Sequence, residues 1–432
     1  MSSQTATLSS DVSAQRGSPG FSWLALLVGL VGLGIAGMGF YQGLQEGNAR
    51  PIVSWLIGFS FWFSMGIGML FITMIWYVFG ASWPIIIRRQ LEHALSAFPW
   101  LALVFLPLLL VGWFYHENPG ILWKWLNPDY VLPGGETVGD DVLYIKKAAF
   151  LNKDFFTIRV AFYFSFWCAW AFMLRRCSFQ MERDGNACWD GRAHNISAIG
   201  IPLCALITTF AAFDFFMSLS YHWFSTMYGV WFFATSMRAG LAGTVIICYL
   251  LSTRGSLKGI YNQAHRYDLG SLCFTFTVFW AYITFCQYFL IYNANIPEET
   301  FWFNIRELGA DWLKNSWWWI GLFGLIFGYF FIPFFYLLIY TNKINPKRLL
   351  AICIWILSFH IIDLYFNIVP AQKVADNTVG FTVREFSVTP WDIASLIGVG
   401  GICTWAFMRS MRKAAPIPIR DPRILGSIHH HE

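Results

Sequence analysis

Residues 52–80 read IVSWLIGFSFWFSMGIGMLFITMIWYVFG and contain no charged side chain. A helix that crosses a hydrocarbon core of about 30 Å needs about 20 consecutive apolar residues, and this stretch exceeds that length. It is too long and too evenly apolar for a strand of a membrane β-barrel, which alternates over about 10 residues. The stretch therefore predicts a transmembrane helix.

Nine other stretches have the same character, and the composition agrees with them. Of the 432 residues, 57% are hydrophobic and only 12% are charged, whereas about 25% of a soluble domain is charged. This excludes a soluble multidomain enzyme, a disordered chain and a disulfide scaffold. We expect an all-α integral membrane protein with about ten transmembrane helices, at residues 22–44, 52–80, 98–116, 156–176, 197–220, 227–251, 269–292, 316–340, 347–369 and 391–411.

The flanking charges predict an orientation. The 29 Lys and Arg residues are more numerous at both ends of the chain and in the second, fourth, sixth and eighth connections than in the other connections. Because cytoplasmic loops carry the excess of basic residues, we expect both termini in the cytoplasm. The polar start has no signal-peptide cleavage pattern, so we interpret it as a short tail before a retained helix. The formal charge of +5 does not suggest nucleic-acid binding.

A weak internal repeat predicts how the helices are grouped. Residues 214–219 (DFFMSL) and 363–368 (DLYFNI) both read Asp, three large apolar residues, a small polar residue, then Leu or Ile. Chance similarity in so apolar a chain is the alternative. The repeat predicts two four-helix bundles, formed by helices 2–5 and helices 6–9, with peripheral helices 1 and 10. The corresponding parts are a tail at 1–21, helix 1 at 22–51, bundles at 52–220 and 221–369, an outer loop and helix 10 at 370–411, and a tail at 412–432.

Small residues at helical spacing predict close packing of the peripheral helices. Ala25, Gly29, Gly32 and Ala36 lie near one face of helix 1, and Ala394 precedes Gly398 by four positions in helix 10. Such spacing lets two backbones approach closely in a membrane. We assign it no chemistry.

The cysteines and histidines do not form a pattern typical of a redox centre. The nine cysteines include no haem-attachment motif and no iron–sulfur run. Cys177, Cys188 and His194 share a predicted inner connection, but their spacing fits no standard zinc site. Only His360 lies well inside a predicted span, which disfavours a bis-histidine haem. We therefore predict no metal or haem on this chain, and we interpret His429–His431 as a functionally silent tail.

Charged side chains within the predicted spans are the main functional signal. Asp214, Arg238 and Asp363 would each cost about 2.5–3.5 kcal/mol at the centre of the membrane. Asp214 and Arg238 lie on consecutive helices joined by a short connection, so we expect them to form an ion pair. The other candidates for proton transfer are polar residues of the spans and their outer ends: His360, Gln287, Tyr282, Ser218 and His222, with Thr235, Ser236 and Asn367 in the same layer.

His360, Asp363 and Asn367 share one face of their helix, because they are spaced i, i+3 and i+7. A histidine one turn from a carboxyl group has a nearby proton partner. This arrangement favours a proton relay, with structural hydrogen bonding and contact with a quinone as alternatives. Since the candidates lie in the outer half, the sequence supports an outward half-channel.

Several of these residues lie in stretches that carry a family resemblance. Residues 213–219 (FDFFMSL), 222–229 (HWFSTMYG), Gln287-Tyr288, 295–300 (NIPEET) and 421–423 (DPR) resemble the F-type membrane subunit of bacterial alternative complex III. That subunit belongs to the polysulfide-reductase (NrfD-like) membrane family. The similarity runs from the first span to the end of the chain.

The resemblance implies a subunit of a quinol:electron-acceptor oxidoreductase in the bacterial cytoplasmic membrane. It implies a cofactor-free chain for which proton conduction has been proposed, with Asp214 and Asp363 as its acids. The implied partners are a C-type quinol-binding paralogue, an iron–sulfur subunit, and multihaem and monohaem cytochrome c subunits, which would hold the haem c groups and iron–sulfur clusters. The long outer connections contain aromatic residues. These residues could form a surface for such partners, or they could belong to the aromatic belt at the membrane interface.

Other functions remain open on the sequence alone. The chain could itself bind the quinol, with menaquinone as the candidate ligand. It could be a secondary transporter, although the repeat halves lack paired helix breaks. It could also be a structural anchor whose charges only pair with each other.

Overall fold

The computed structural model describes residues 19–132, 135–307, 316–371, 373–376, 380–383 and 386–430. Most of the predicted tail at residues 1–21 lies outside the described residues, and so does His431.

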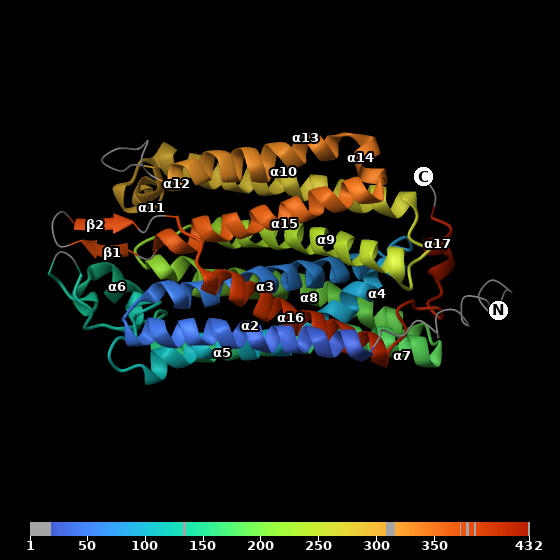
Figure 1. Ribbon diagram of the computed structural model, residues 1–432, viewed down its shortest axis with the longest axis horizontal. Coiled ribbons are helices and arrows are strands. Elements are labelled where there is room, and N and C mark those ends of the chain that lie inside the picture. Colours follow the sequence, from blue (N-terminus) through green and yellow to red (C-terminus); the bar gives the residue numbers. More distant parts are fainter. Residues whose placement is uncertain are drawn as a thin grey trace.

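The chain is an all-α integral membrane protein, as expected. Within the described residues, ten helices are long and apolar enough to cross a membrane. They lie side by side along the long axis of the molecule (Figure 1). In chain order they are α2 (Pro19–Gln45), α3 (Ala49–Val78), α4 (Ile85–Ala94) continued by η1 (Leu95–Ala97) and α5 (Phe98–Phe114), α7 (Lys153–Asp184), α8 (Cys188–Phe215) with η4 (Met217–Ser220), α9 (Tyr228–Arg254), α10 (Gln263–Ala294), α12 (Ser316–Trp319) continued by the π-helix η6 (Ile320–Phe331) and α13 (Ile332–Leu338), α15 (Pro346–Ile368) with η7 (Val369–Ala371), and α16 (Pro390–Lys413).

Shorter elements close the two ends of the helix array. The end where α2 begins, here called the termini end, also carries α14 (Tyr340–Ile344) and α17 (Ile424–Ile428). The opposite end, the loop end, carries η2 (Lys124–Leu126), η3 (Val138–Asp140), α6 (Val142–Lys147) and α11 (Pro297–Glu307). It also carries strands β1 (Lys373–Asp376) and β2 (Gly380–Val383), which pair antiparallel with Lys373 opposite Val383. The sequence analysis treated this strand pair only as a loop.

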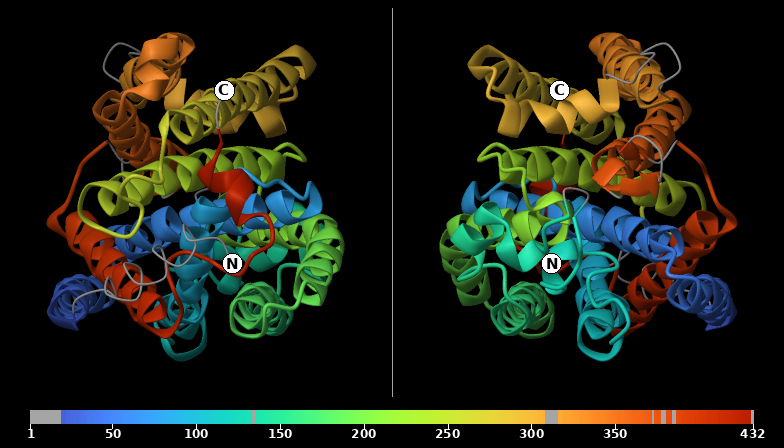
Figure 2. Two further views of the ribbon diagram at one scale, coloured as in Figure 1. Left: turned by 90° about the vertical axis from the view of Figure 1, so that its right-hand side faces the viewer. Right: turned by 90° about the vertical axis from the view of Figure 1, so that its left-hand side faces the viewer.

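The helices pack as two sets of four, called the first and the second bundle, which are in close contact with each other. Helices α3, α4–α5, α7 and α8 pack together, and so do α9, α10, η6–α13 and α15. Helices α3 and α9 join the two bundles, and the peripheral pair α2 and α16 packs on α3 (Figure 2). Helix α3 is therefore the central element and is mostly buried.

Glycines permit the closest helix contacts. A Cβ atom on Gly32 would lie 2.7 Å from the Cα atom of Gly398, which confirms the predicted close packing of α2 and α16. Between α3 and α9, a Cβ atom on Gly240 would lie 2.8 Å from the backbone of Gly68, and one on Gly68 would overlap the carbonyl oxygen of Ser236. The joint between the bundles therefore has no room for a side chain at these two glycines.

The third membrane helix begins earlier than predicted. It runs continuously from Ile85, not from residue 98, so Arg88 and Arg89 lie inside a helix and not in a connection. Both arginines are buried. In the sequence, Arg88 and Arg89 seemed to flank a membrane span. A hydropathy profile does not take into account ion-pair partners that lie far away along the chain, such as Asp421 for Arg88.

We expect Gly68→Ala to lower the free energy of unfolding by about 3 kcal/mol, because the added methyl group must push α3 and α9 apart. Gly34→Ala in α2 is the matched control, since a Cβ atom there meets nothing within 4 Å. That control should raise stability by up to about 1 kcal/mol, through helix propensity alone. Unfolding of both variants in detergent, followed by tryptophan fluorescence, measures the difference. Equal stabilities would contradict the tight joint.

Candidate functional site

Asp214 is paired within its own bundle. Its carboxylate accepts two hydrogen bonds of 2.8 Å from the Nε and Nη2 atoms of Arg159 on α7, and a third of 2.8 Å from the hydroxyl of Tyr163. All three side chains are buried. A fixed guanidinium in this bidentate geometry favours the ionised carboxylate, so this site is a structural ion pair.

The predicted Asp214–Arg238 pair is therefore wrong. Arg238 lies in the second bundle, where its Nη2 atom donates to the carbonyl oxygen of Tyr329. Its guanidinium lies 3.8 Å from the centre of the Tyr329 ring and 5.5 Å from that of Trp280. The Nε and Nη1 atoms are buried and have no hydrogen-bond partner in the structure. Arg238 is thus held by aromatic faces, and not by a carboxylate.

Asp363 has a different environment, made of neutral donors. Its Oδ2 atom accepts hydrogen bonds from the hydroxyl of Thr235 at 3.0 Å and from the indole nitrogen of Trp280 at 3.2 Å. Its Oδ1 atom accepts one from the amide of Asn367 at 3.3 Å. None of these donors carries a charge that would hold the carboxylate ionised. Asp363 is therefore better suited than Asp214 to gain and lose a proton.

His360 connects Asp363 to the first bundle. Its Nε2 atom lies 2.8 Å from the hydroxyl of Ser64 on α3, and its Nδ1 atom lies 3.3 Å from the hydroxyl of Thr235 on α9. The hydroxyl of Tyr329 is 3.4 Å from the same Nδ1 atom. Because Ser64 donates to the carbonyl oxygen of Phe61 at 3.0 Å, we assign the ring proton to Nε2, which leaves Nδ1 as an acceptor for the hydroxyl of Tyr329 while the Thr235 proton points to Asp363.

These contacts form one continuous chain of exchangeable groups. It runs from Asp363 through Thr235 and His360 to Ser64, and its steps measure 3.0, 3.3 and 2.8 Å. All four side chains are fully or almost fully buried. We call them the relay cluster. The cluster crosses the joint between the two bundles.

The two halves of the repeat share one local contact. Ser218 donates to the carbonyl oxygen of Asp214 at 2.6 Å, and Asn367 donates to that of Asp363 at 2.8 Å. In each case the small polar residue bonds back by four positions. Ser60 and Thr73 bond back in the same way, so this contact is typical of small polar residues in helices and does not test the repeat.

The remaining candidates lie apart from the relay cluster. Gln287 is buried on α10 and accepts from the hydroxyl of Ser225 at 3.3 Å. Ser236 faces α3, and its buried hydroxyl has no partner in the structure. Tyr282 is 61% exposed on the outside of α10, so it points away from the polar layer.

His222 belongs to a contact at the loop end. It bonds to the Oδ2 atom of Asp141, which also accepts from the hydroxyl of Tyr221 at 2.8 Å. Burial alone would raise the pKa of Asp141, but the hydrogen bonds from His222, Tyr221 and the backbone of Leu143 outweigh it and hold the pKa below its ordinary value. Burial lowers the pKa of the neighbouring Lys147, which donates to the carbonyl oxygen of Tyr221 at 2.6 Å.

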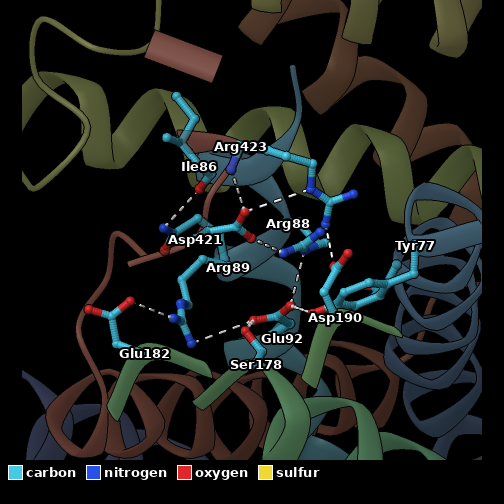
Figure 3. Close-up of polar contacts among 12 residues, drawn as sticks. Tyr77, Ile86, Arg88, Arg89, Glu92, Ser178, Glu182, Asp190, Asp421 and Arg423 are labelled. Carbon is cyan, nitrogen blue, oxygen red and sulfur yellow. Dashed lines mark hydrogen bonds and ion pairs between the residues drawn. The ribbon is translucent and has the colours of Figure 1, made fainter. Parts of the chain in front are cut away.

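The sequence analysis missed a buried ion network at the termini end (Figure 3). Glu92 accepts from the hydroxyl of Tyr77 at 2.8 Å and from Ser178, and lies 3.3 Å from the Nε atom of Arg88. Arg88 also pairs with Asp421 at 2.8 Å, which ties α4 to the C-terminal segment. The network therefore places titratable groups at the termini end, where the sequence suggested few residues for proton transfer.

The network extends to neighbouring helices. Arg89 lies 3.4 Å from Glu182 on α7, and Arg423 pairs with Asp190 on α8. Residues 421–423 had drawn attention only through the family resemblance. The signal that could have revealed the network is the i, i+3 and i+4 spacing of Arg89 and Arg88 with Glu92, which is typical of helical ion pairs.

The tail predicted to be silent is packed where it is described. His430 lies 2.7 Å from the carboxylate of Asp268, and its carbonyl oxygen accepts from Asn262 at 2.6 Å. Within the described residues, no group of three or more His, Cys, Asp or Glu side chains is arranged to hold a metal ion. Cys177 and His194 lie in α7 and α8, not in a connection.

The fold and these polar layers define a multi-pass helical membrane protein with an internal chain of exchangeable groups. No protein-family model and no curated protein matches this sequence significantly.

We expect Arg159→Gln to lower the free energy of unfolding by about 3–5 kcal/mol, because it leaves the Asp214 carboxylate buried without a cation. The double variant with Asp214→Asn should be more stable than this single variant, since the uncompensated charge is gone. Lys146→Gln, on the exposed face of α6, controls for loss of a cation at the same end. Thermal unfolding in detergent measures these variants together with the single Asp214→Asn variant, and additive effects of the two single substitutions in the double variant would contradict the pair.

The Asp141 contact predicts a pH dependence at the loop end. Because the folded pKa is below the ordinary value of about 3.9, the contact stabilises α6 above that value, and this stability is lost as the pH falls through the folded pKa. Hydrogen exchange of residues 142–147, corrected for intrinsic rates, should show protection that decreases in this acidic range. His222→Gln should reduce the change, whereas Asp129→Asn at an exposed position should not. An unchanged profile in His222→Gln would refute the assignment.

Proposed function

We propose that this chain is an integral membrane subunit of a quinol:electron-acceptor oxidoreductase of the alternative complex III type. Its role is to provide a proton-conducting half-channel and a scaffold for assembly. The family resemblance supports the type of complex. The relay cluster, which joins a carboxyl group, two hydroxyls and an imidazole across the bundle joint, is the observation that carries the proton-conducting role.

The proposed transfer moves one proton through neighbouring atoms. When Asp363 is protonated, the Thr235 hydroxyl rotates towards His360; Asp363 then gives its proton to the Thr235 oxygen as the Thr235 hydroxyl gives its own to Nδ1. The resulting imidazolium releases the proton on Nε2 to the Ser64 oxygen. The Ser64 hydroxyl then rotates away from the Phe61 carbonyl and gives its own proton to an internal water molecule, which the proposal requires beside this buried residue. The chain consumes no reductant, since each step only exchanges protons. Rotation of the hydroxyls and a tautomer change of the imidazole reset it.

Arg238 tunes this chain in the proposal. Its guanidinium lies against the same Tyr329 and Trp280 rings that contact His360 and Asp363. A nearby cation favours the ionised carboxylate, so Arg238 would promote proton release from Asp363. Its two nitrogen atoms without a partner, Nε and Nη1, suit internal water molecules that extend the chain.

The electrons are assigned to partner subunits. In this proposal, a C-type paralogue binds the quinol, and an iron–sulfur subunit with multihaem and monohaem cytochromes c carries the electrons. In this proposal they contact the loop end, which carries α6, α11 and the strand pair. The termini end would face the cytoplasm of a bacterium, in agreement with the distribution of basic residues.

The decisive test is Asp363→Asn in the assembled complex. We expect quinol-driven proton movement through this chain to slow by roughly 100-fold, the loss typical of a removed acid–base group. Thr235→Val should have a similar effect, because it keeps the shape and removes the bridging hydroxyl. Tyr282→Phe, on the exposed face of α10, is the matched control and should behave as wild type.

Assembly is followed separately, by co-purification with haem-staining subunits. An unchanged proton yield in an assembled Asp363→Asn complex would refute the relay. A chain that purifies without any cytochrome would refute the type of complex. A quinone resolved against this chain would instead favour a quinol-binding role.

A further inference from the structure

Arg306 is a buried cation close to the relay cluster that the proposed function does not use. It lies on α11 at the loop end (Figure 1) and is fully buried. Its Nε atom donates to the carbonyl oxygen of Phe366 at 2.9 Å, its Nη2 atom to that of Asn367 at 3.4 Å, and its Nη1 atom to that of Trp302. Two of these hydrogen bonds join α11 to the last turn of α15.

The end of a helix is a favourable place for this guanidinium. The last four carbonyl groups of a helix have no partner within the helix, and the helix dipole places partial negative charge there. Arg306 supplies donors to two such groups of α15, which ends at Ile368. It therefore fixes the backbone at residues 366 and 367.

The stretch 295–300, NIPEET, forms the turn that places α11 and Arg306. Asn295 follows α10 in the left-handed conformation, with a φ of 49°, and asparagine adopts this conformation more readily than most residues. Pro297 then begins α11, and proline suits the first position of a helix. The sequence analysis used this stretch only for the family resemblance, but in the structure it turns the chain from α10 into α11.

Aromatic rings hold the guanidinium in place. Its central carbon lies 3.4 Å from the centre of the Trp302 ring and 5.3 Å from that of Phe366. Trp302 in turn stacks on Trp223, in the connection before α9, with ring centres 4.4 Å apart and an interplanar angle of 15°. Both tryptophans are buried. The guanidinium is therefore confined by rings as well as by hydrogen bonds.

Asn367 connects this helix end to the relay acid. Its side-chain amide donates to the carbonyl oxygen of Asp363 at 2.8 Å and to the Oδ1 atom of Asp363 at 3.3 Å. The other carboxyl oxygen, Oδ2, accepts from Thr235. In the proposed relay the proton leaves from the side of Thr235, so Oδ1 is the carbonyl oxygen of the protonated acid.

We propose that Arg306 is a positioning residue for Asp363. It fixes the last turn of α15, so that the Asn367 amide stays on Oδ1 and Oδ2 stays turned towards Thr235. Arg306 acts through Asn367 and exchanges no proton itself. The inference rests on the proposed function, because it takes Asp363 as the relay acid.

Infrared difference spectroscopy of the full-length chain in nanodiscs tests this contact. A protonated carboxyl group gives a C=O stretching band, and the band of Asp363 is the one that Asp363→Asn removes. A hydrogen bond to the carbonyl oxygen lowers the frequency of this band. We therefore expect Arg306→Gln to move the band to higher frequency, as the Asn367 amide leaves Oδ1. Asn367→Leu removes the amide directly and sets the full size of the shift.

Arg266→Gln is the matched control. Arg266 also belongs to the second bundle and also donates to a helix end, the carbonyl oxygen of Ile344 at 2.7 Å, but it lies at the termini end. This variant should leave the Asp363 band in place. A wild-type frequency in Arg306→Gln would overturn the proposal, and so would an equal shift in Arg266→Gln.

Arg306→Lys separates the positioning role from a loss of folding. It keeps a cation and a donor at the end of α15, so it should shift the band less than Arg306→Gln does. If Arg306→Gln does not fold, Arg306→Lys carries the test, and a wild-type frequency there would overturn the proposal.

Proton movement in the assembled complex distinguishes this inference from the proposed function. We expect Arg306→Gln to slow quinol-driven proton movement about ten-fold, the effect of losing roughly one hydrogen bond to the transferring group. An unchanged rate in Arg306→Gln beside a slowed Asp363→Asn would contradict this inference alone. If Asp363→Asn removes no carboxyl band at any pH at which the chain stays folded, the relay itself is contradicted, and this inference with it.

Discussion

Hydrocarbon offers no hydrogen bonds, so each polar group within a span has to find its partner inside the protein. This constraint explains why α3 lies at the centre. It is the most deeply enclosed span, and it brings Ser64 to His360 at one level and packs Gly68 against α9 at another. The joint between the bundles thus meets two requirements at once: close backbone contact and a polar layer sealed from lipid.

The two acids of the repeat illustrate how partners decide the role of a buried charge. Asp214 has a bidentate arginine, which favours its ionised form, and removing the arginine would leave the carboxylate without compensation. Asp363 has only hydroxyl, indole and amide donors. The two corresponding acids therefore differ in their partners: Asp214 has a cation in bidentate contact, and Asp363 has neutral donors.

The spans and the shared face of His360 and Asp363 could be predicted from the sequence, because both follow from local spacing. The partner of Asp214 could not. These helices are apolar nearly all round, so no stripe indicates which side faces the core, and the rotation that directs Asp214 to Arg159 and exposes Tyr282 has no sequence signal. Arg88 was misplaced for a related reason: its partner Asp421 is 333 residues away. The strand pair escaped prediction because its residues lie in a connection with little apolar alternation.

The contact between Arg88 and Asp421 also bears on how the chain is made. Helix α4 is synthesised well before the carboxylate that pairs with its arginine, which lies 333 residues further along the chain. During that interval Glu92 is the nearest anion available to Arg88. The first bundle can insert, but its charge balance is completed only when the C-terminal segment returns to the termini end. The contact between Arg88 and Asp421 can therefore form only after the ten described spans have been synthesised.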